Sequence, residues 1–304
     1  MLKRAGKRPK ATSIERKEAK TAYLCLIPAF LGLSVLTYIP LVVVFILSFF
    51  QWKGLSAPVF NGGENYVRLF TVDPYFKDSI VVTVWFSVIA VIGGMVYSLI
   101  VAMLLNRKIP ARGFFRALFY LPYILPAAAV YIGWSWLYET NFGLFNYILK
   151  FLGINNVMFL SDSSAVVPSL ALIAVWLSGN YIVIFLAGLQ NVPRVYYEAA
   201  EIDGANSWQR FWNITLPSMT PIVFYNLLMS LITNMQVVTP ALALTSGGPG
   251  NSSMFITYLM YKYAFKSNQI GYGCAVSFVF FILIAVFTAI VFSTSKSWVY
   301  YEGE

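Results

Sequence analysis

Long uncharged runs alternate with short polar segments along the whole 304-residue chain. These runs are Thr21–Phe50, Ser79–Leu105, Ala117–Tyr138, Ser163–Asn191, Thr215–Tyr261 and Gln269–Ser295. A helix that crosses a bilayer needs about 20 apolar residues, so each run is long enough for one crossing. The pattern therefore predicts an all-α integral membrane protein with six transmembrane helices.

The fifth run is long enough for two crossings, but its second half is interrupted. Gly, Pro and Ser dominate the stretch 245–253, TSGGPGNSS, and such residues are typical of a loop. We therefore expect one crossing, then an external loop at 245–253, then an amphipathic segment at Met254–Phe265.

The first run differs from a cleavable signal peptide. A signal peptide has an apolar core of about 7–15 residues followed by a small-residue cleavage site, whereas Thr21–Phe50 continues for thirty residues without a charge. It is predicted to be a membrane span, bent at Pro28 and Pro40. The expected layout is a basic cytoplasmic tail at 1–20, a six-helix domain at 21–295 and a short cytoplasmic tail at 296–304.

Composition supports a membrane protein and orients it. The chain is 59% hydrophobic and 11% charged, whereas a soluble domain carries about 25% charged residues. Its net charge of +9 does not indicate nucleic-acid binding, because eight of the 21 basic residues lie in the first twenty positions. With the amino terminus inside, the segments 1–20, 106–116, 190–214 and 296–304 hold 15 basic residues and the outer segments hold six. This asymmetry predicts that both termini are cytoplasmic.

The predicted spans lack groups that could power transport or hold a metal. All twelve acidic residues fall outside the spans, and only Asp78 and Glu139 border one. Proton- and sodium-driven carriers use intramembrane ionisable groups, so energy for uphill transport would have to come from a cytoplasmic partner. Cys25 and Cys274 lie in apolar runs and are expected to be small core residues; there is no histidine, and no metal site is expected.

The polar segment between the fourth and fifth spans has clear helix punctuation. Asn191 and Pro193 occupy positions suited to a helix cap and a first-turn proline, and Gly204 a position suited to a helix end. Ser207 can cap a second short helix that leads towards Pro217. The segment 191–217 is therefore predicted to form a helix, a glycine turn and a second helix.

The first of these helices has an acidic face. Glu198 and Glu201 lie one turn apart with Asp203 close by, and Ala199 and Ala200 form a flat spot between them. A helix lying on the anionic inner leaflet would instead present Lys and Arg. Small side chains allow close approach and carboxylates pair with arginines, so docking in a basic groove of another protein is the favoured interpretation.

The residues of this segment resemble the EAA loop of ABC importer permeases, and the sugar permeases in particular. The matching residues are Glu198-Ala199-Ala200, Asp203-Gly204-Ala205, Phe211, Ile214, Leu216-Pro217 and Pro221. Other motifs of the same family are matched by Glu64-Asn65-Tyr66, by Leu121-Pro122-Tyr123-Ile124-Leu125-Pro126 and by Thr245–Pro249 followed by Tyr261 and Ala264-Phe265. The resemblance extends over about residues 20 to 295.

This resemblance implies a set of partners and a role for each loop residue. The chain would pair with a second homologous permease, two ATP-binding cassette ATPases and an extracytoplasmic solute-binding protein, and would import a sugar or oligosaccharide across a bacterial or archaeal cytoplasmic membrane. ATP and Mg²⁺ would bind the ATPases, so no cofactor and no catalytic residue is expected in this chain. Glu198 would anchor the ATPase, with Ala199 and Ala200 packed close to it, and Ala205 would belong to the same coupling motif. Asp203 and Gly204 would shape the turn, and Phe211, Leu216 and Pro217 would lead into the fifth span.

Polar residues within the spans are candidates for the solute path. A stripe in the fifth span follows helical spacing, and a second group interrupts the fourth span; with an aromatic residue of the third, the candidates are Ser230, Thr233, Asn234, Gln236, Ser178, Asn180, Tyr181 and Trp134. Amides, hydroxyls and aromatic faces are the groups that hold sugars. Hydrogen bonding between helices is the alternative role for such residues in membranes.

Three other classes of protein share some of these features with the importer. A secondary carrier would need intramembrane ionisable groups or a twelve-span repeat, and a channel for a polar solute would conduct without ATP. A membrane scaffold could use the acidic helix for docking but offers no reason for the polar stripe. The sequence favours the importer over all three and does not identify its sugar.

Overall fold

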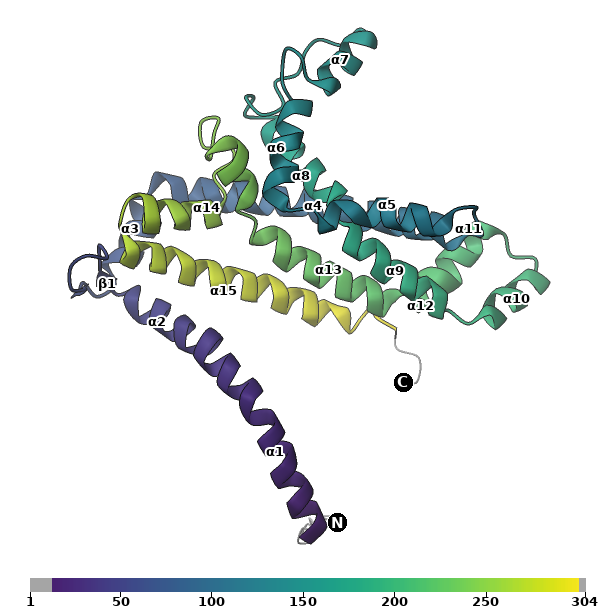
Figure 1. The fold of residues 1–304 in the computed structure, drawn as a ribbon, viewed down its shortest axis with the longest axis horizontal. Helices are drawn as coiled ribbons and strands as arrows, with labels where there is room; N and C mark the ends of the chain where they lie inside the picture. Colours follow the sequence, from purple (N-terminus) through teal and green to yellow (C-terminus); the bar gives the residue numbers. More distant parts are fainter. Residues whose placement is uncertain (1–12, 301–304) are drawn as a thin grey trace.

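The computed structural model describes residues 13–300, which fold into a helical bundle with one small hairpin (Figure 1). Three continuous helices are long and apolar enough to cross a membrane: Lys17–Leu47, Pro74–Asn106 and Ile270–Ser295. Three further pairs of helices meet this criterion only together, because each pair is bent. Counting each bent pair as one span gives six candidate spans among the described residues, the number that the hydrophobic pattern predicts.

The first span is one long arm that leaves the bundle (Figure 1). It consists of α1 (Ser13–Leu33), the π-helical turn η1 (Ser34–Tyr38) and α2 (Ile39–Leu47). Pro28 lies inside α1, and the irregular turn comes just before Pro40, whose missing N–H removes a helical hydrogen bond. The helix begins within the predicted tail 1–20; residues 1–12 lie outside the described part of the chain. Cys25 is exposed on this arm, so its prediction as a core residue was wrong.

A hairpin and a short helix close one end of the bundle. Strands β1 (Phe50–Gln51) and β2 (Val59–Phe60) pair antiparallel, and α3 (Glu64–Thr71) follows them. Asp73 then caps α4 (Pro74–Asn106), accepting a hydrogen bond of 2.8 Å from the Tyr75 amide. This helix is the central element of the bundle and packs on α8, α9 and α13.

The third, fourth and fifth runs are broken helices, which the hydrophobic pattern did not predict. Helices α5 (Arg112–Ile124) and α6 (Ala127–Leu137) meet at 99°, α8 (Val166–Trp176) and α9 (Gly179–Asn191) at 48°. In the fifth run, α11 (Ser207–Arg210), η2 (Phe211–Thr215) and α12 (Leu216–Ser218) meet α13 (Thr220–Met235) at 68°. The sharpest break has a plain cause, because Leu125 precedes Pro126 and adopts an extended conformation that ends α5.

The segment after the glycine-rich loop, which was predicted to be amphipathic over Met254–Phe265, packs into the core through its first part. It forms α14 (Ile256–Tyr261) and the π-helical turn η4 (Lys262–Lys266) before α15 (Ile270–Ser295). Phe255 and Leu259 are fully buried, and Phe255 contacts the ring of Phe86 on α4 with centroids 5.0 Å apart. Its apolar positions up to Leu259 therefore face neighbouring helices, whereas Phe265 is exposed. Two further short elements are α7 (Leu144–Phe151) and the π-helical turn η3 (Ala241–Thr245).

The core has two parts along the bundle. The larger part joins α4, α8, α14 and α15 around Phe86, Leu170, Phe255 and Val276. The smaller part joins the other ends of α4 and α9 around Leu105, Phe185 and Met219, and the segment 191–217 packs against it through Val192, Tyr197 and Ile214. The predicted polar segment is therefore anchored on the bundle by its apolar side chains.

Candidate functional site

The segment 191–217 forms the helix, turn and helix that its sequence predicts. The first helix, α10, covers Arg194–Ile202, and no residue in it is buried. Pro193 occupies the N-cap position of α10, whereas Asn191, which was expected to cap it, is the last residue of α9. In Figure 1, α10 projects at one end of the bundle, away from the hairpin and α3.

Gly204 ends α10 as predicted. Its φ of 74° lies in the left-handed region that glycine adopts without strain. The Ala205 amide donates to the Ala200 carbonyl at 2.8 Å, and the Gly204 amide donates to the Glu201 carbonyl at 3.2 Å. This pair of bonds is the Schellman arrangement, which satisfies carbonyls that the helix end would leave unpaired.

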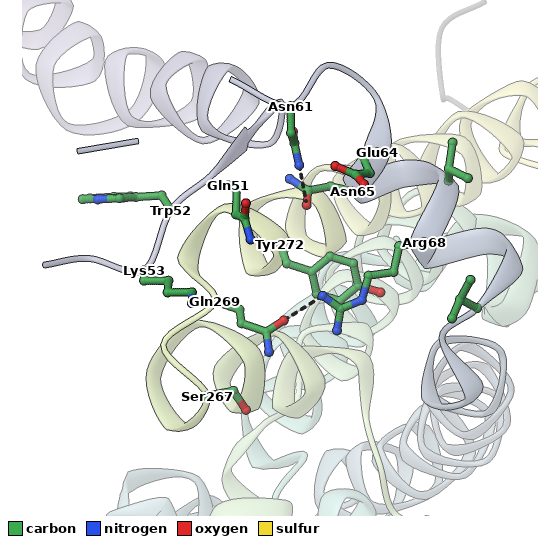
Figure 2. A pocket seen from close by; sticks show the side chains of 12 residues that line it. Gln51, Trp52, Lys53, Asn61, Glu64, Asn65, Arg68, Ser267, Gln269 and Tyr272 are labelled. Carbon is green, nitrogen blue, oxygen red and sulfur yellow. Dashed lines mark hydrogen bonds between the residues drawn. The ribbon is translucent and has the colours of Figure 1, made fainter. Parts of the chain in front are cut away.

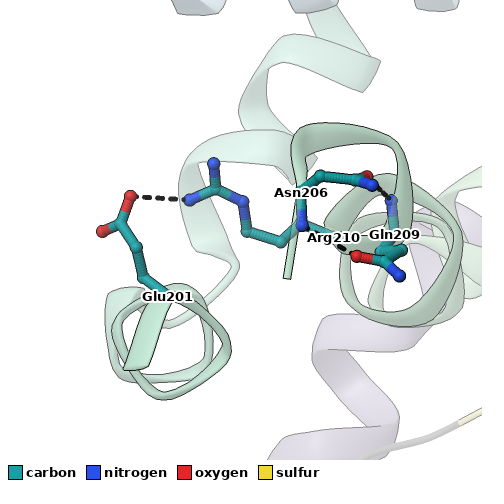
Figure 3. Close-up of polar contacts among 4 residues, drawn as sticks. All are labelled: Glu201, Asn206, Gln209 and Arg210. Atoms are coloured by element: carbon teal, nitrogen blue, oxygen red, sulfur yellow. Dashed lines mark hydrogen bonds and ion pairs between the residues drawn. The ribbon is translucent and has the colours of Figure 1, made fainter. Parts of the chain in front are cut away.

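The second short helix is capped by Asn206, and the prediction that Ser207 caps it was wrong by one residue. Asn206 Oδ1 accepts from the Gln209 amide at 2.9 Å, and Gln209 Oε1 accepts from the Asn206 amide at 2.8 Å (Figure 3). Such a reciprocal capping box fixes the direction in which the chain enters α11.

Two side-chain contacts fix α10 relative to the second helix, and neither was predicted. Arg210 Nη1 lies 3.0 Å from Glu201 Oε1 in an ion pair (Figure 3). The hydroxyls of Tyr197 and Thr215 lie 2.8 Å apart. Spacing along the chain gives no sign of either contact, because both depend on how the glycine turn folds the two helices together.

These contacts leave the predicted docking face open. Glu198, Ala199 and Asp203 are exposed, and Ala200 and Ala205 are half-buried. Within residues 13–300, the Glu198 carboxylate forms no ion pair. Phe211, Leu216 and Pro217 are half-buried and connect the segment to α13.

A cavity of about 640 Å³ lies between α5, α6, α8, α9 and α13. It brings together five of the predicted solute-path residues, from two different runs of the sequence: Ser178, Asn180, Tyr181, Thr233 and Asn234. Tyr181 is buried in the first turn of α9, beside Asn180. Asn234 Nδ2 donates to the Ser230 carbonyl at 2.8 Å, which leaves its amide oxygen for another donor.

Three of the predicted path residues lie elsewhere. Trp134 does not line this cavity and packs instead with Tyr138, Phe145 and Trp176, its ring centroid 5.7 Å from that of Phe145. Ser230 is buried behind Asn234, and Gln236 is exposed beyond the end of α13.

Ser178 fits both roles considered for polar residues in the spans, namely lining the solute path and hydrogen bonding between helices. It lines the cavity, but its hydroxyl lies 2.9 Å from that of Ser98 on α4 and donates to the Val175 carbonyl at 2.7 Å. The Ser178 hydroxyl is thus engaged in bonds within and between helices, which is the common use of serine in membranes.

Four more tyrosines line the cavity, and the sequence reasoning missed them: Tyr120, Tyr123, Tyr131 and Tyr225. The rings of Tyr120 and Tyr123 are 5.7 Å apart on α5. The available signal was the pair Tyr120 and Tyr123 within an uncharged run, since a tyrosine in an apolar span needs a partner for its hydroxyl. With Tyr181, they make a wall of aromatic faces and hydroxyls.

A second hollow, of about 780 Å³, opens at the opposite end of the bundle from α10. Figure 2 shows Arg68 beside Tyr272 and Gln269 in this hollow. The Arg68 guanidinium carbon lies 4.2 Å from the centre of the Tyr272 ring, and its Nη1 donates to Gln269 Oε1 at 2.9 Å. Within the described residues, no group of three or more His, Cys, Asp or Glu side chains lies where it could hold a metal ion.

The family follows from comparison with known proteins. The family model described as the binding-protein-dependent transport system inner membrane component matches residues 94–300. This match covers more than half of the chain, and the chain belongs to that family. It is the membrane-spanning permease component of an ABC importer.

Individual relatives match along nearly the whole length. The chain is 35% identical to the probable ABC transporter permease protein YesP of Bacillus subtilis, over 95% of this chain and 94% of YesP. It is 30% identical to the trehalose/maltose transport system permease protein MalF of Thermococcus litoralis, over 94% of this chain and 97% of MalF. Its fold matches a chain in the crystal structure of a bacterial ABC transporter that imports the acidic polysaccharide alginate, with a TM-score of 0.78, 21% identity, and coverage of 92% of this chain and 96% of that chain.

Proposed function

We propose that this chain forms half of the translocation pore of an ATP-driven importer of sugars or oligosaccharides in a bacterial or archaeal cytoplasmic membrane. The family and the relative named for trehalose and maltose transport support a sugar as the solute. The cavity of about 640 Å³ supports it independently, because tyrosine faces alternate there with amide and hydroxyl groups. Such a lining matches the apolar ring faces and hydroxyl edges of a saccharide.

The coupling role is supported by the exposed carboxylate of Glu198 on α10. Glu198 is exposed on a helix that is capped at its end and tied to the next helix, while the neighbouring Glu201 is neutralised by Arg210. A carboxylate held on a rigid support without an ion-pair partner in the described chain suits bidentate pairing with an arginine of another protein. We assign that partner to an ATP-binding cassette ATPase, with ATP and Mg²⁺ bound there and not on this chain.

The remaining partners follow from what the chain leaves exposed. From position 17 to position 47, no side chain of the first span is buried, which fits contact with lipid and with a second, homologous permease. The hollow lined by Arg68 lies at the far end from α10, where an extracytoplasmic solute-binding protein would dock. The amino and carboxyl termini would then lie in the cytoplasm.

Transport would proceed by alternating access. ATP draws two ATPases together and moves the α10 helices of the two permeases as rigid bodies. The broken helices α5–α6, α8–α9 and α12–α13 provide joints at which the bundle can change shape around the cavity. Hydrolysis then resets the pore.

Reconstitution into proteoliposomes tests this proposal directly. The complete importer, with its partner permease, ATPases and loaded binding protein, should accumulate sugar only when ATP is present on the ATPase side. A vesicle lacking the ATPases should accumulate none. Accumulation against a gradient without ATPase would identify a secondary carrier, and downhill flux without ATP would identify a channel; either result would overturn the proposal.

A further inference from the structure

Three helix ends meet at Gln190, next to the segment 191–217, which is called the coupling segment below. Gln190 is the penultimate residue of α9, three residues before Pro193, from which α10 begins. In the amide orientation that satisfies its hydrogen bonds, Gln190 Oε1 accepts from Arg116 Nη2 at 2.9 Å and from Arg112 Nη2 at 3.2 Å. Both arginines belong to α5. One neutral oxygen therefore receives two charge-assisted hydrogen bonds from a different helix.

Arg112 extends this junction to α4. Its Nε donates to the Leu105 carbonyl at 2.5 Å, and its Nη2 lies 3.4 Å from Asn106 Oδ1. The carbonyls in the last turn of a helix lack partners within that helix and attract a cation. The guanidinium of Arg112 thus connects the end of α4, the start of α5 and the end of α9.

Helices α5 and α9 are also in direct backbone contact farther along. A Cβ on Gly179 would lie 2.8 Å from the Phe119 carbonyl oxygen and 3.2 Å from Tyr120 Cα. Backbones this close leave little room for the two helices to slide past each other at this point. The arginines hold the same two helices at the end nearest α10, so the pair is held at two separate points.

The junction adjoins the solute cavity. A small hollow of about 190 Å³ is lined by Arg116, Gln190 and Tyr120, and Tyr120 also lines the large cavity together with Tyr123. A continuous series of contacts therefore leads from the coupling segment through Gln190 and Arg116 to the aromatic wall of the cavity.

We propose that Arg112 and Arg116 clamp Gln190 so that a displacement of α10 moves α5, and with it the tyrosines of the solute cavity. These three are positioning residues, and the inference rests on the coupling role proposed for α10. The clamp ties the end of α9, from which α10 begins, to α5, in addition to the packing of the segment 191–217 on the smaller part of the core. Without it, the coupling segment would still dock and respond to ATP, but the cavity would respond less.

The ratio of ATP hydrolysed to sugar imported separates this role from a merely structural one. The complete importer is reconstituted with loaded binding protein, and both rates are measured in the same vesicles. Gln190→Leu should retain at least half of the stimulated ATP hydrolysis while uptake falls at least about five-fold, since two charge-assisted hydrogen bonds are lost. Gln190→Glu places a carboxylate between the two guanidiniums and should keep a ratio within about two-fold of the unaltered protein.

Controls separate the clamp from other causes. Arg107→Gln removes an exposed cation from the connection between α4 and α5. It should leave the rates of ATP hydrolysis and sugar uptake unchanged. If Gln190→Leu assembles poorly, Gln190→Asn, which is one methylene shorter, takes its place with the same expected rise in the ratio. Equal ratios for the Leu or Asn variant and the Glu variant would overturn the clamp.

The proposed function is tested separately by Glu198→Lys in the same assay. If that variant loses uptake while Gln190→Leu keeps a normal ratio, the clamp is rejected and the coupling role stands. If Glu198→Lys imports sugar normally, the coupling role itself is rejected, and the clamp with it.

Discussion

Glu201 and Arg210 form an ion pair of 3.0 Å that closes the glycine turn between α10 and α11. The Glu201 side chain is 70% exposed, and that of Arg210 is 25% exposed. One helical turn away, Glu198 is exposed without an ion-pair partner in the described part of the chain. Two glutamates that look equivalent in the sequence therefore serve different purposes, one within the segment and one available to a partner.

This difference predicts opposite outcomes for two matched variants. Glu198→Lys should leave the protein in the membrane but abolish co-purification with the ATPase and sugar uptake, because a cation would face a basic groove. Glu201→Gln removes an exposed ion pair, which contributes about 0.2–1 kcal/mol, and should lower uptake less than about three-fold. Normal uptake in Glu198→Lys, with the ATPase still bound, would contradict the docking role.

The cavity makes a similar prediction for two amides at the end of the fifth span. Asn234→Leu should impair transport by about ten-fold without loosening the ATPase, because the change removes a hydrogen-bonding group of about 1–3 kcal/mol from the solute path. Gln236→Leu should leave transport unchanged, since Gln236 lies outside the cavity lining. Uptake kinetics and ATPase co-purification measure the two effects. Equal losses of transport in both variants would contradict the prediction that Asn234, but not Gln236, lines the solute path.

Asp73 joins three elements at the opposite end of the bundle. Its Oδ2 accepts hydrogen bonds from the hydroxyls of Tyr263 at 2.8 Å and Tyr272 at 2.6 Å. Asp73→Asn should lower the free energy of unfolding by about 1–3 kcal/mol, because bonds to a charged acceptor become bonds to a neutral one. Asp78→Asn, an exposed carboxylate on the same helix, is the control and should change it little. Thermal unfolding in detergent measures both variants.

The same contact makes stability sensitive to alkaline pH. Burial, and then the bond to the Asp73 carboxylate, raise the pKa of the Tyr263 hydroxyl above its ordinary 10.0. A raised pKa means that the folded chain retains this proton where the unfolded chain loses it, so the contribution is complete below about pH 10 and declines above it. In Tyr263→Phe this part of the decline should be absent. An identical alkaline profile for both proteins would contradict the assignment.

The contact between α5 and α9 predicts the effect of a single methyl group. Gly179→Ala would place its Cβ 2.8 Å from the Phe119 carbonyl oxygen and should destabilise the protein by about 1–3 kcal/mol. Gly133→Ala, in α6, meets nothing within 4 Å and should be neutral or stabilising by up to about 1 kcal/mol. The melting temperatures of the purified proteins compare them. A neutral Gly179→Ala would show that the helices can separate there.

The sequence by itself determined the membrane class, the six apolar runs and the helix–glycine turn–helix of the segment 191–217. These features depend on local chemistry, because bilayer thickness fixes the length of a span and glycine alone enters the left-handed region freely. It also identified five side chains that line the cavity, since polar groups in an apolar run need a partner or a solute.

Only the tertiary structure decided which polar side chains share a cavity, and that Trp134 does not line it. It also decided that Met254, Phe255 and Leu259 are buried, that the third, fourth and fifth spans are broken, and that Glu201 rather than Glu198 pairs with Arg210. A hydrophobic pattern records whether a position avoids water. It does not tell whether the side chain faces lipid or another helix, because both surroundings are apolar. The partner of each face is therefore set by packing between distant segments, which no local pattern encodes.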